Sequence, residues 1–202
     1  MRIRTLVFDF GNVVGFVDHR RATTRMAACA ALSLDAMHAY LFGGQLEDDY
    51  ESNRISSDEF LRRVIETCGL RCTAGELARW YVDIFWPNPE VCGLIPLLKP
   101  RYRLLLGSNT TELHSRHFRR QFADVLRHFD ALVLSHEVGR RKPRAEFFDH
   151  CLRLAGCAPQ ECVFIDDLPA NVEGARACGW HGIVYTGIDG LRRGLAELGV
   201  RV

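Results

Sequence analysis

The stretch that decides the fold is IRTLVFDFGNVV, residues 3–14. Its apolar run, residues 3–8, ends at a carboxylate, Asp9, and a glycine, Gly11, follows two positions later. A short continuous apolar run closed by a turn signal is typical of a strand buried on both faces of a parallel sheet. Ligands gather at the carboxyl ends of such strands. We therefore expect Asp9 to lie at the ligand-binding edge of an α/β sheet.

Four more apolar runs have the character of buried strands. They cover residues 102–106, 131–134, 162–165 and 182–185. Most are followed by polar or glycine-containing residues and then by a helical pattern, an alternation that is typical of a doubly wound parallel sheet. The sequence thus predicts a Rossmann-like α/β fold with right-handed crossovers, and an amphipathic helix over residues 190–202 packs on the sheet.

The long stretch between the first two predicted strands is expected to be entirely helical. Apolar residues at helical spacing predict helices over residues 22–31, 34–41, 57–68 and 74–85, and Ser56 with Glu59 forms a capping-box pattern. The segment Trp86-Pro87-Asn88-Pro89 cannot easily continue a helix, because proline lacks an amide donor and restricts the residue before it. We therefore expect a core domain of residues 1–15 and 87–202, with a helical cap domain of residues 16–86 inserted into it.

The composition favours a protein that acts on a small molecule. The 202 residues, 48% of them hydrophobic, are enough to bury a core. A balance of 26 basic and 25 acidic residues lacks the charge footprint of a nucleic-acid binder. Eight cysteines without a C-x-x-C pair disfavour a zinc ribbon and suit a reducing compartment, and no apolar run is long enough to span a bilayer. We expect a cytoplasmic protein that binds neither nucleic acid nor membrane, with its oligomeric state left open.

Polar side chains also follow the other predicted strands. Ser108 and Asn109 come after the second, Lys142 lies beyond the third, and Asp166 and Asp167 follow the fourth. Taken in order, the segments VFDFGNVV, LLLGSNT, GRRKPRAEFF and VFIDDLPANVEGA resemble the four motifs of the haloacid dehalogenase superfamily. Each residue alone could be a turn residue, a helix cap or a solvated lysine. Four motifs in the right order would require several independent coincidences.

The residue types themselves point to phosphoryl chemistry. A carboxylate such as Asp9 is a competent nucleophile toward phosphorus, and it splits one displacement into two steps through an aspartyl phosphate. Asp9 and the Asp166-Asp167 pair would repel each other at close range unless a cation lay between them. Mg²⁺ favours oxygen ligands and bridges carboxylates and phosphate oxygens. The sequence therefore predicts a Mg²⁺-dependent hydrolase of a phosphorylated small molecule.

The resemblance implies a role for each site residue. It implies that the catalytic groups are Asp9 and Lys142 and that the substrate-binding groups are Ser108 and Asn109. It also implies that the metal ligands are Asp9, Asp167 and the carbonyl of Gly11. Asp166 and Asn171 would support these ligands from behind. Which of the two adjacent aspartates touches the metal stays open at this point. The helical insertion occupies the position of the cap in this superfamily.

One position departs from the superfamily pattern. Most of its phosphatases carry a second aspartate, a general acid and base, two residues after the nucleophile, where this chain has Gly11. Such a group typically contributes ~10²- to 10⁴-fold in rate. Residues 8–13 and 47–60 resemble a subgroup that includes a bacterial glucose-1-phosphate phosphatase. This resemblance implies a phosphatase of small metabolites such as sugar phosphates, with leaving groups that need little proton donation.

Two other functions stay open. Dehalogenases of the same superfamily also lack the second aspartate, so carbon–halogen hydrolysis is the first alternative, although those enzymes work without metal. The second is a member that binds a ligand without turnover, against which the intact Asp9, Lys142 and Asp167 argue. Candidates for lining the substrate pocket are Tyr40, Phe42, Glu47, Tyr50 and Trp80, whereas His19 is expected to be a surface or capping residue.

Overall fold

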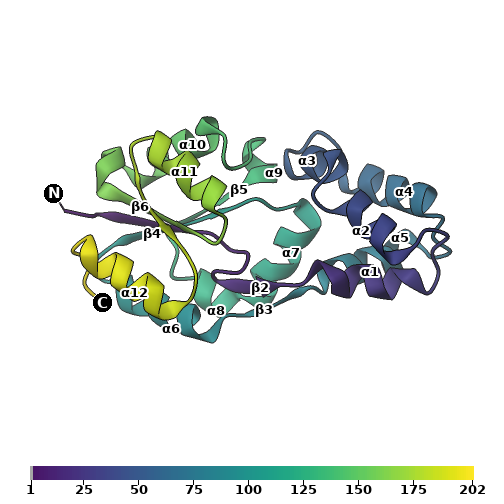
Figure 1. Ribbon diagram of the computed structural model, residues 1–202, viewed down its shortest axis with the longest axis horizontal. Helices are drawn as coiled ribbons and strands as arrows, with labels where there is room; N and C mark the ends of the chain where they lie inside the picture. The colour runs from purple at the N-terminus through teal and green to yellow at the C-terminus, as the bar shows by residue number, and fades with distance from the viewer. Residues whose placement is uncertain (1) are drawn as a thin grey trace.

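A five-stranded parallel sheet forms the centre of one end of the molecule (Figure 1). The computed structural model describes residues 2–202. Its central strands are β1 (Thr5–Phe8), β4 (Arg103–Ser108), β5 (Ala131–Leu134), β6 (Cys162–Asp166) and β7 (His181–Val184). They lie in the order β5-β4-β1-β6-β7, and every neighbouring pair is parallel. The predicted Rossmann-like class is confirmed, and all five strands lie where the apolar runs placed them.

Helices cover both faces of the sheet. Those helices are α6 (Pro89–Leu98), α10 (Ala145–Ala155), α11 (Pro169–Ala177) and α12 (Ile188–Glu197). Val7 and Phe164 belong to the core beneath α10 and α11, whereas Leu6 and Ile165 belong to the core that includes side chains of α6 and α12. Alternate residues of one strand point to opposite faces. Burial on both faces explains why the strands are continuous apolar runs instead of alternating ones.

Further helical elements complete the connections between the strands. They are α7 (Glu112–Gln121), α8 (Ala123–Leu126), α9 (Ser135–Val138) and the 3₁₀ turn η1 (Pro159–Glu161). Thr111 begins α7, because its side chain accepts the amide hydrogen of His114. The C-terminal helix ends earlier than expected, at Glu197, and buries Leu191 and Leu195 as its spacing predicted.

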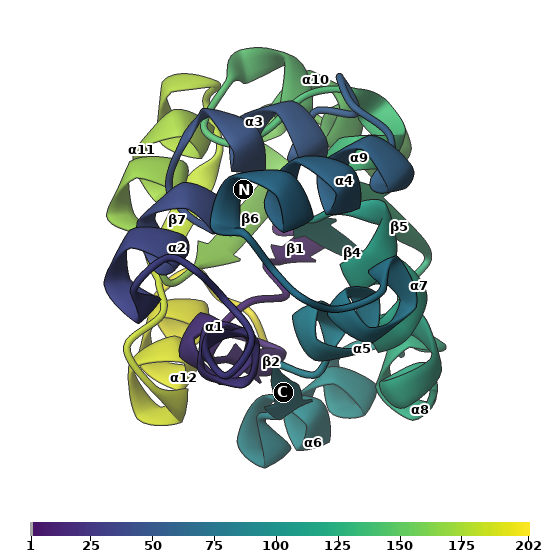
Figure 2. The same cartoon turned by 90° about the vertical axis from the view of Figure 1, so that its right-hand side faces the viewer.

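Five helices lie beyond the carboxyl ends of the strands, at the end of the molecule opposite the chain termini (Figures 1 and 2). They are α1 (His19–Ala27), α2 (Leu34–Leu41), α3 (Gln45–Glu51), α4 (Ser57–Cys68) and α5 (Ala74–Val82). The sequence did not predict α3, because the segment is mostly polar and only Leu46, Tyr50 and Glu51 are buried in it.

We propose that the cap domain comprises residues 16–86. Among the described residues, no helix is both long and apolar enough to cross a membrane.

The expectation that residues 16–86 contain no strand is wrong. Strands β2 (Gly15–Val17) and β3 (Phe85–Pro87) pair antiparallel where the chain leaves the sheet domain and returns to it. Three-residue strands are too short to show an alternating pattern. The paired segments give the insertion a two-stranded connection to the sheet, so the Trp86-Pro87 segment ends the helical region as an extended strand.

The capping box predicted at α4 is only half formed. Ser56 accepts the amide hydrogen of Glu59 at 3.2 Å, but the Glu59 carboxylate pairs with Arg62 and Arg63 instead of returning to the cap. The complete box lies at the start of α5, where Thr73 and Glu76 each accept the amide hydrogen of the other. The arginines of α4 compete for the Glu59 carboxylate, and the sequence pattern did not account for them.

Candidate active site

Three carboxylates meet at the carboxyl edge of the sheet. Asp9 follows β1, Asp166 ends the neighbouring strand β6, and Asp167 is the next residue. One carboxylate oxygen from each lies within 4.8 Å of the other two. Asp9 and Asp166 are buried, and Asp167 is half-buried. Parallel pairing of β1 with β6 therefore brings together acids that are more than 150 positions apart in the sequence.

Lys142 lies between two of these acids. Its Nζ donates to Asp9 Oδ1 at 2.6 Å, to Asp166 Oδ2 at 2.7 Å and to the carbonyl oxygen of Gly107 at 2.9 Å. All three donors of the ammonium group are thus occupied. Burial disfavours the charged lysine, but Asp9 and Asp166 outweigh burial and raise the pKa of Lys142. The side chain is a fully buried cation held in one orientation.

Asp166 and Asp167 have different partners, although they are adjacent. Both oxygens of Asp166 are occupied: Oδ1 accepts from the Leu168 amide and from Asn171 Nδ2, while Oδ2 accepts from Asn171 and from Lys142. Asp167 accepts one hydrogen bond, on Oδ2 from Asn12 at 3.0 Å. Asp9 uses Oδ1 for Lys142. Within residues 2–202, the oxygens with no protein partner are therefore Asp9 Oδ2 and Asp167 Oδ1.

The three acids carry more negative charge than Lys142 can neutralise. Burial raises the pKa of Asp9 to about 7, Lys142 opposes this shift, and Asp166 and Asp167 add to it. Burial also raises the pKa of Asp167, although the Asn12 hydrogen bond opposes the shift. A cation close to Asp9 and Asp167 would remove this conflict, and hard carboxylate oxygens suit Mg²⁺. The donor set therefore fits the ion that the sequence predicted.

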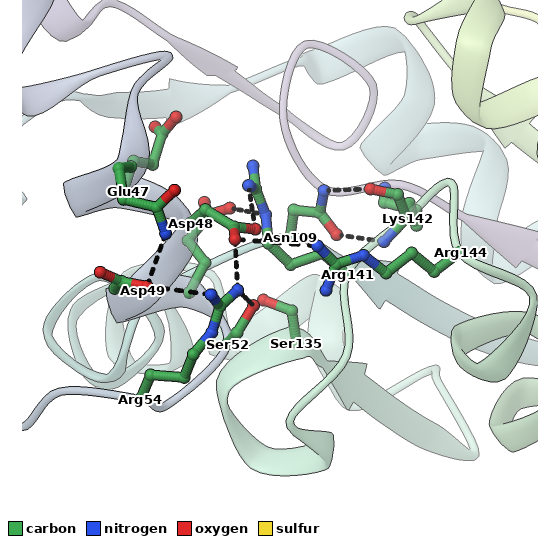
Figure 3. A network of polar contacts seen from close by, with 12 residues as sticks. Glu47, Asp48, Asp49, Ser52, Arg54, Asn109, Ser135, Arg141, Lys142 and Arg144 are labelled. Carbon is green, nitrogen blue, oxygen red and sulfur yellow. Dashed lines mark hydrogen bonds and ion pairs between the residues drawn. The ribbon is translucent and has the colours of Figure 1, made fainter.

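Ser108 and Asn109 lie beside the acids, at the end of β4. The Asn109 side chain accepts the Lys142 amide hydrogen at 2.8 Å and donates to the Lys142 carbonyl at 3.0 Å (Figure 3). This pair of bonds fixes the backbone that carries Lys142. Ser108 donates its hydroxyl hydrogen to the Asn109 carbonyl at 3.2 Å. Both residues line the same cavity as Asp9, so the structure brings the proposed substrate-binding groups to the proposed nucleophile.

A cavity of about 340 Å³ opens over the acids. Of the five side chains expected to line it, Glu47 is the only one that does. The other four, Tyr40, Phe42, Tyr50 and Trp80, belong to the hydrophobic core of the insertion or pack against it, because large aromatic side chains are needed to fill that core. His19 faces the cavity, contrary to expectation, and its ring stacks on Phe42 with centroids 4.1 Å apart.

Three further titratable residues of the cavity were not predicted from the sequence. Arg141 and Glu51 line the cavity with Glu47, and His114 lines it from α7. The position of Arg141 directly before Lys142 was the available signal, since neighbours of a site lysine share its loop. Glu51 and His114 gave no such signal, because they lie outside all four motifs.

Arg141 connects helix α3 of the insertion to the loop that carries Lys142 (Figure 3). Its Nη1 donates to Asp48 Oδ1 at 2.8 Å, and its Nε lies 2.7 Å from Glu51 Oε2. Burial raises the pKa of Glu51 to about 8, Glu47 adds to the shift, and Arg141 opposes it. The guanidinium is the closest positive charge that stabilises ionised Glu51 in this buried position.

Arg141→Met is expected to lower the free energy of unfolding by about 3 kcal/mol, because it leaves buried Glu51 without its cation. Denaturant titration at pH 9, above the folded-state pKa of Glu51 of about 8, measures the change. Arg127→Met is the matched control, because Arg127 is 70% exposed and lies 3.9 Å from Asp124; its effect should stay below about 0.5 kcal/mol. Equal stabilities for the two variants would show that the contact between Arg141 and Glu51 contributes nothing.

A Rossmann-like sheet with a carboxylate after its first strand, a buried lysine and a helical insertion defines one class of hydrolases. The family model of haloacid dehalogenase-like hydrolases matches residues 3–179. The chain therefore belongs to the haloacid dehalogenase-like hydrolase family.

Individual proteins are similar to the chain over most of its length. A D-ribitol-5-phosphate phosphatase of Bacteroides thetaiotaomicron is 25% identical over 184 residues, which cover 88% of this chain and 89% of the relative. A HAD-like family hydrolase from Porphyromonas gingivalis has a solved structure with a TM-score of 0.81 and 28% identity, covering 96% of this chain and 98% of that one. A HAD family enzyme from Bacteroides thetaiotaomicron, solved with magnesium and inorganic phosphate, has a TM-score of 0.79 at 22% identity over 92% and 94% of the two chains, a likeness that concerns the fold.

Proposed function

We propose that the chain is a Mg²⁺-dependent phosphatase of small phosphorylated metabolites, sugar phosphates among them, and that it acts through an aspartyl phosphate on Asp9. The observation that carries this proposal is the cluster of Asp9, Lys142 and the Asp166-Asp167 pair, of which Asp9, Lys142 and Asp167 line a cavity of about 340 Å³. A related protein that hydrolyses D-ribitol 5-phosphate supports a phosphorylated polyol or sugar as substrate.

The reaction takes place in two displacements at phosphorus. In the first, a carboxylate oxygen of Asp9 bonds to phosphorus while the ester bond breaks, and its electron pair leaves with the alcohol oxygen, which takes up a proton from solvent. In the second, a water oxygen bonds to the same phosphorus and gives up a proton to solvent while the bond to Asp9 breaks, which returns the carboxylate and releases inorganic phosphate. Lys142 holds positive charge beside the phosphoryl group through both steps, while Ser108 and the Asn109 amide hold its oxygens.

The metal would be held by the groups that the protein leaves free. These are the carboxylates of Asp9 and Asp167 and the carbonyl of Gly11. When bound, Mg²⁺ would supply positive charge that offsets the repulsion between these carboxylates and an anionic phosphate. Asp166 acts as a positioning residue, because its oxygens are occupied by Lys142, Asn171 and the Leu168 amide. These occupied oxygens support Asp167, and not Asp166, as the proposed metal ligand.

Removal of divalent ions is expected to abolish phosphate release. The purified chain, treated with a chelator and then transferred to chelator-free buffer, should hydrolyse a panel of sugar phosphates only after Mg²⁺ is added. Chloride release from 2-haloacids that is indifferent to the chelator would favour the carbon–halogen alternative. Tight binding of sugar phosphates without turnover in Mg²⁺ would favour a non-catalytic member.

Gly11→Asp is expected to raise kcat for esters with poor leaving groups by about tenfold or more, because it adds the missing proton donor. There is room for the side chain: a Cβ on Gly11 would lie 3.6 Å from Val17 Cγ2 and 3.8 Å from Asp9 Oδ2. A hexose 6-phosphate should gain more than an aryl phosphate, whose leaving group needs no proton. Gly11→Asn is the control of equal shape, and equal rates for the Asp and Asn variants would contradict this account.

A further inference from the structure

Within residues 2–202, no side chain of the cavity offers a free positive charge to a second anionic group of a substrate. Of the residues that line it in the described part of the chain, Arg141 and Lys142 are the only arginine and lysine. Lys142 is bound by Asp9 and Asp166, and Arg141 by Asp48 and Glu51. Every cation is thus already paired with carboxylates, apart from any metal that binds beside the phosphoryl group.

The two histidines of the cavity do not supply such a charge either. Burial lowers the pKa of His19 to about 4 and that of His114 to about 3. Both imidazoles are therefore neutral near pH 7. Their rings lie in aromatic stacks, His19 on Phe42 and His114 on Tyr81, each with centroids 4.1 Å apart. They contribute flat, uncharged surface to the wall of the cavity.

Among the carboxylates of α3 in the described structure, Glu47 is the one that forms no ion pair with an arginine. Its Oε2 accepts the Gly43 amide hydrogen at 2.7 Å, whereas its Oε1 has no hydrogen-bond partner within residues 2–202. Neighbouring Asp48 and Glu51 on the same helix are both paired with Arg141. Figure 3 shows the Glu47 carboxylate turned away from the arginines that bind Asp48 and Asp49. One acceptor oxygen is therefore available to a molecule in the cavity.

We propose that Glu47 is a specificity-determining residue: it accepts hydrogen bonds from hydroxyl groups of the leaving group and excludes leaving groups that carry a second negative charge. The substrate class is then the phosphoric monoesters of uncharged polyhydroxy compounds. This inference rests on the proposed function, since it concerns the part of the substrate that departs with the ester oxygen. A hydrogen bond to a charged acceptor is among the stronger ones in proteins, whereas two facing carboxylates repel.

The surroundings of Glu47 determine the pH at which the test is carried out. Burial raises the pKa of Glu47, while the Gly43 amide, Arg141 and His38 oppose the shift and Asp48 adds to it. Because burial favours the neutral carboxyl of Glu47, a mildly alkaline pH favours its ionised form. All measurements use the full chain in Mg²⁺ at such a pH.

The test compares two substrates that differ at one carbon. Glucose 1-phosphate has a hydroxymethyl group where glucuronic acid 1-phosphate has a carboxylate, and both leave from the same anomeric position. The unmodified chain should prefer glucose 1-phosphate in kcat/KM. Glu47→Gln has the same shape without the charge, so its kcat/KM for glucuronic acid 1-phosphate should rise about tenfold, which reduces the preference. Glu90→Gln, an exposed residue of α6, is the control and should leave the ratio unchanged.

Hydrolysis of p-nitrophenyl phosphate distinguishes the role of Glu47 from the phosphatase activity itself. Its leaving group has no hydroxyl for Glu47, so Glu47→Gln should hydrolyse it at the rate of the unmodified chain. An unchanged ratio of the two glucose-type substrates, with p-nitrophenyl phosphate still hydrolysed, would overturn the role of Glu47 and leave the phosphatase standing. No phosphate release from any of the three would overturn both. Calorimetric binding of the same two sugars to Asp9→Asn, with and without Glu47→Gln, should show the same change in preference without turnover.

Discussion

Asp9→Asn is expected to lower kcat for phosphate esters by at least about 10⁴-fold, the largest effect of any single substitution in this chain. Removal of a nucleophile in a covalent mechanism costs losses on this scale, because binding and the remaining charges support only a residual rate. Asparagine keeps the size of the side chain and an oxygen that accepts from Lys142. Phosphate release under single-turnover conditions in Mg²⁺ measures the effect.

The same variant should stay folded. Without metal, the pKa of Asp9 is raised from 3.8 to about 7 in the folded chain, so ionisation of Asp9 costs stability as pH rises through this range. Asparagine does not ionise, so above pH 7 in chelator Asp9→Asn should unfold at the same temperature as the unmodified chain or at a higher one. Asp124→Asn, on a fully exposed side chain, is the control and should change neither rate nor melting temperature. Substantial activity in Asp9→Asn would contradict its role as nucleophile.

Lys142→Met is expected to lower kcat by about 10²- to 10³-fold, as removal of one preorganised positive group at a reacting oxyanion does. It should also destabilise the chain, because Asp9 and Asp166 would lose their shared cation in a buried position. Steady-state kinetics in saturating Mg²⁺ and thermal melting measure the two effects separately.

A second substitution separates the charge effect from a folding effect. In Lys142→Met with Asp166→Asn, the buried lysine and one of its two carboxylate partners are neutralised together. The melting temperature should recover toward that of the unmodified chain, while kcat should stay low, because the phosphate still lacks its positive neighbour. Recovery of kcat together with stability would show that Lys142 has only a structural role.

The sheet could be predicted from the sequence because its strands are buried on both faces. Residues 162–165 contain no polar side chain, and such runs are easy to recognise. The short strands β2 and β3 were missed, because a pair of three-residue segments is defined by contacts between residues 70 positions apart and by no local pattern. Helix α3 was missed for a related reason: it is stabilised by ion pairs from Asp48 and Glu51 to Arg141 of the sheet domain.

The site could be predicted only as far as the motifs reach. Asp9, Lys142 and the Asp166-Asp167 pair follow strands whose carboxyl ends must meet at one edge, so topology alone places them together. Residues of the insertion form a wall of the cavity, and the direction in which their side chains point depends on how the helices pack. Aromatic residues expected there, such as Tyr50, are used in the core, while His19 and Glu51 face the substrate space.

The most direct measurement is mass spectrometry of the chain quenched with acid during turnover of a sugar phosphate in Mg²⁺. Our account predicts one phosphoryl group on the peptide that contains Asp9, and its absence in Asp9→Asn. In water labelled with heavy oxygen, the label should appear in the released phosphate and not in Asp9, because water attacks phosphorus. A phosphoryl group on a different residue, or heavy oxygen in the Asp9 carboxylate after one turnover, would contradict the account.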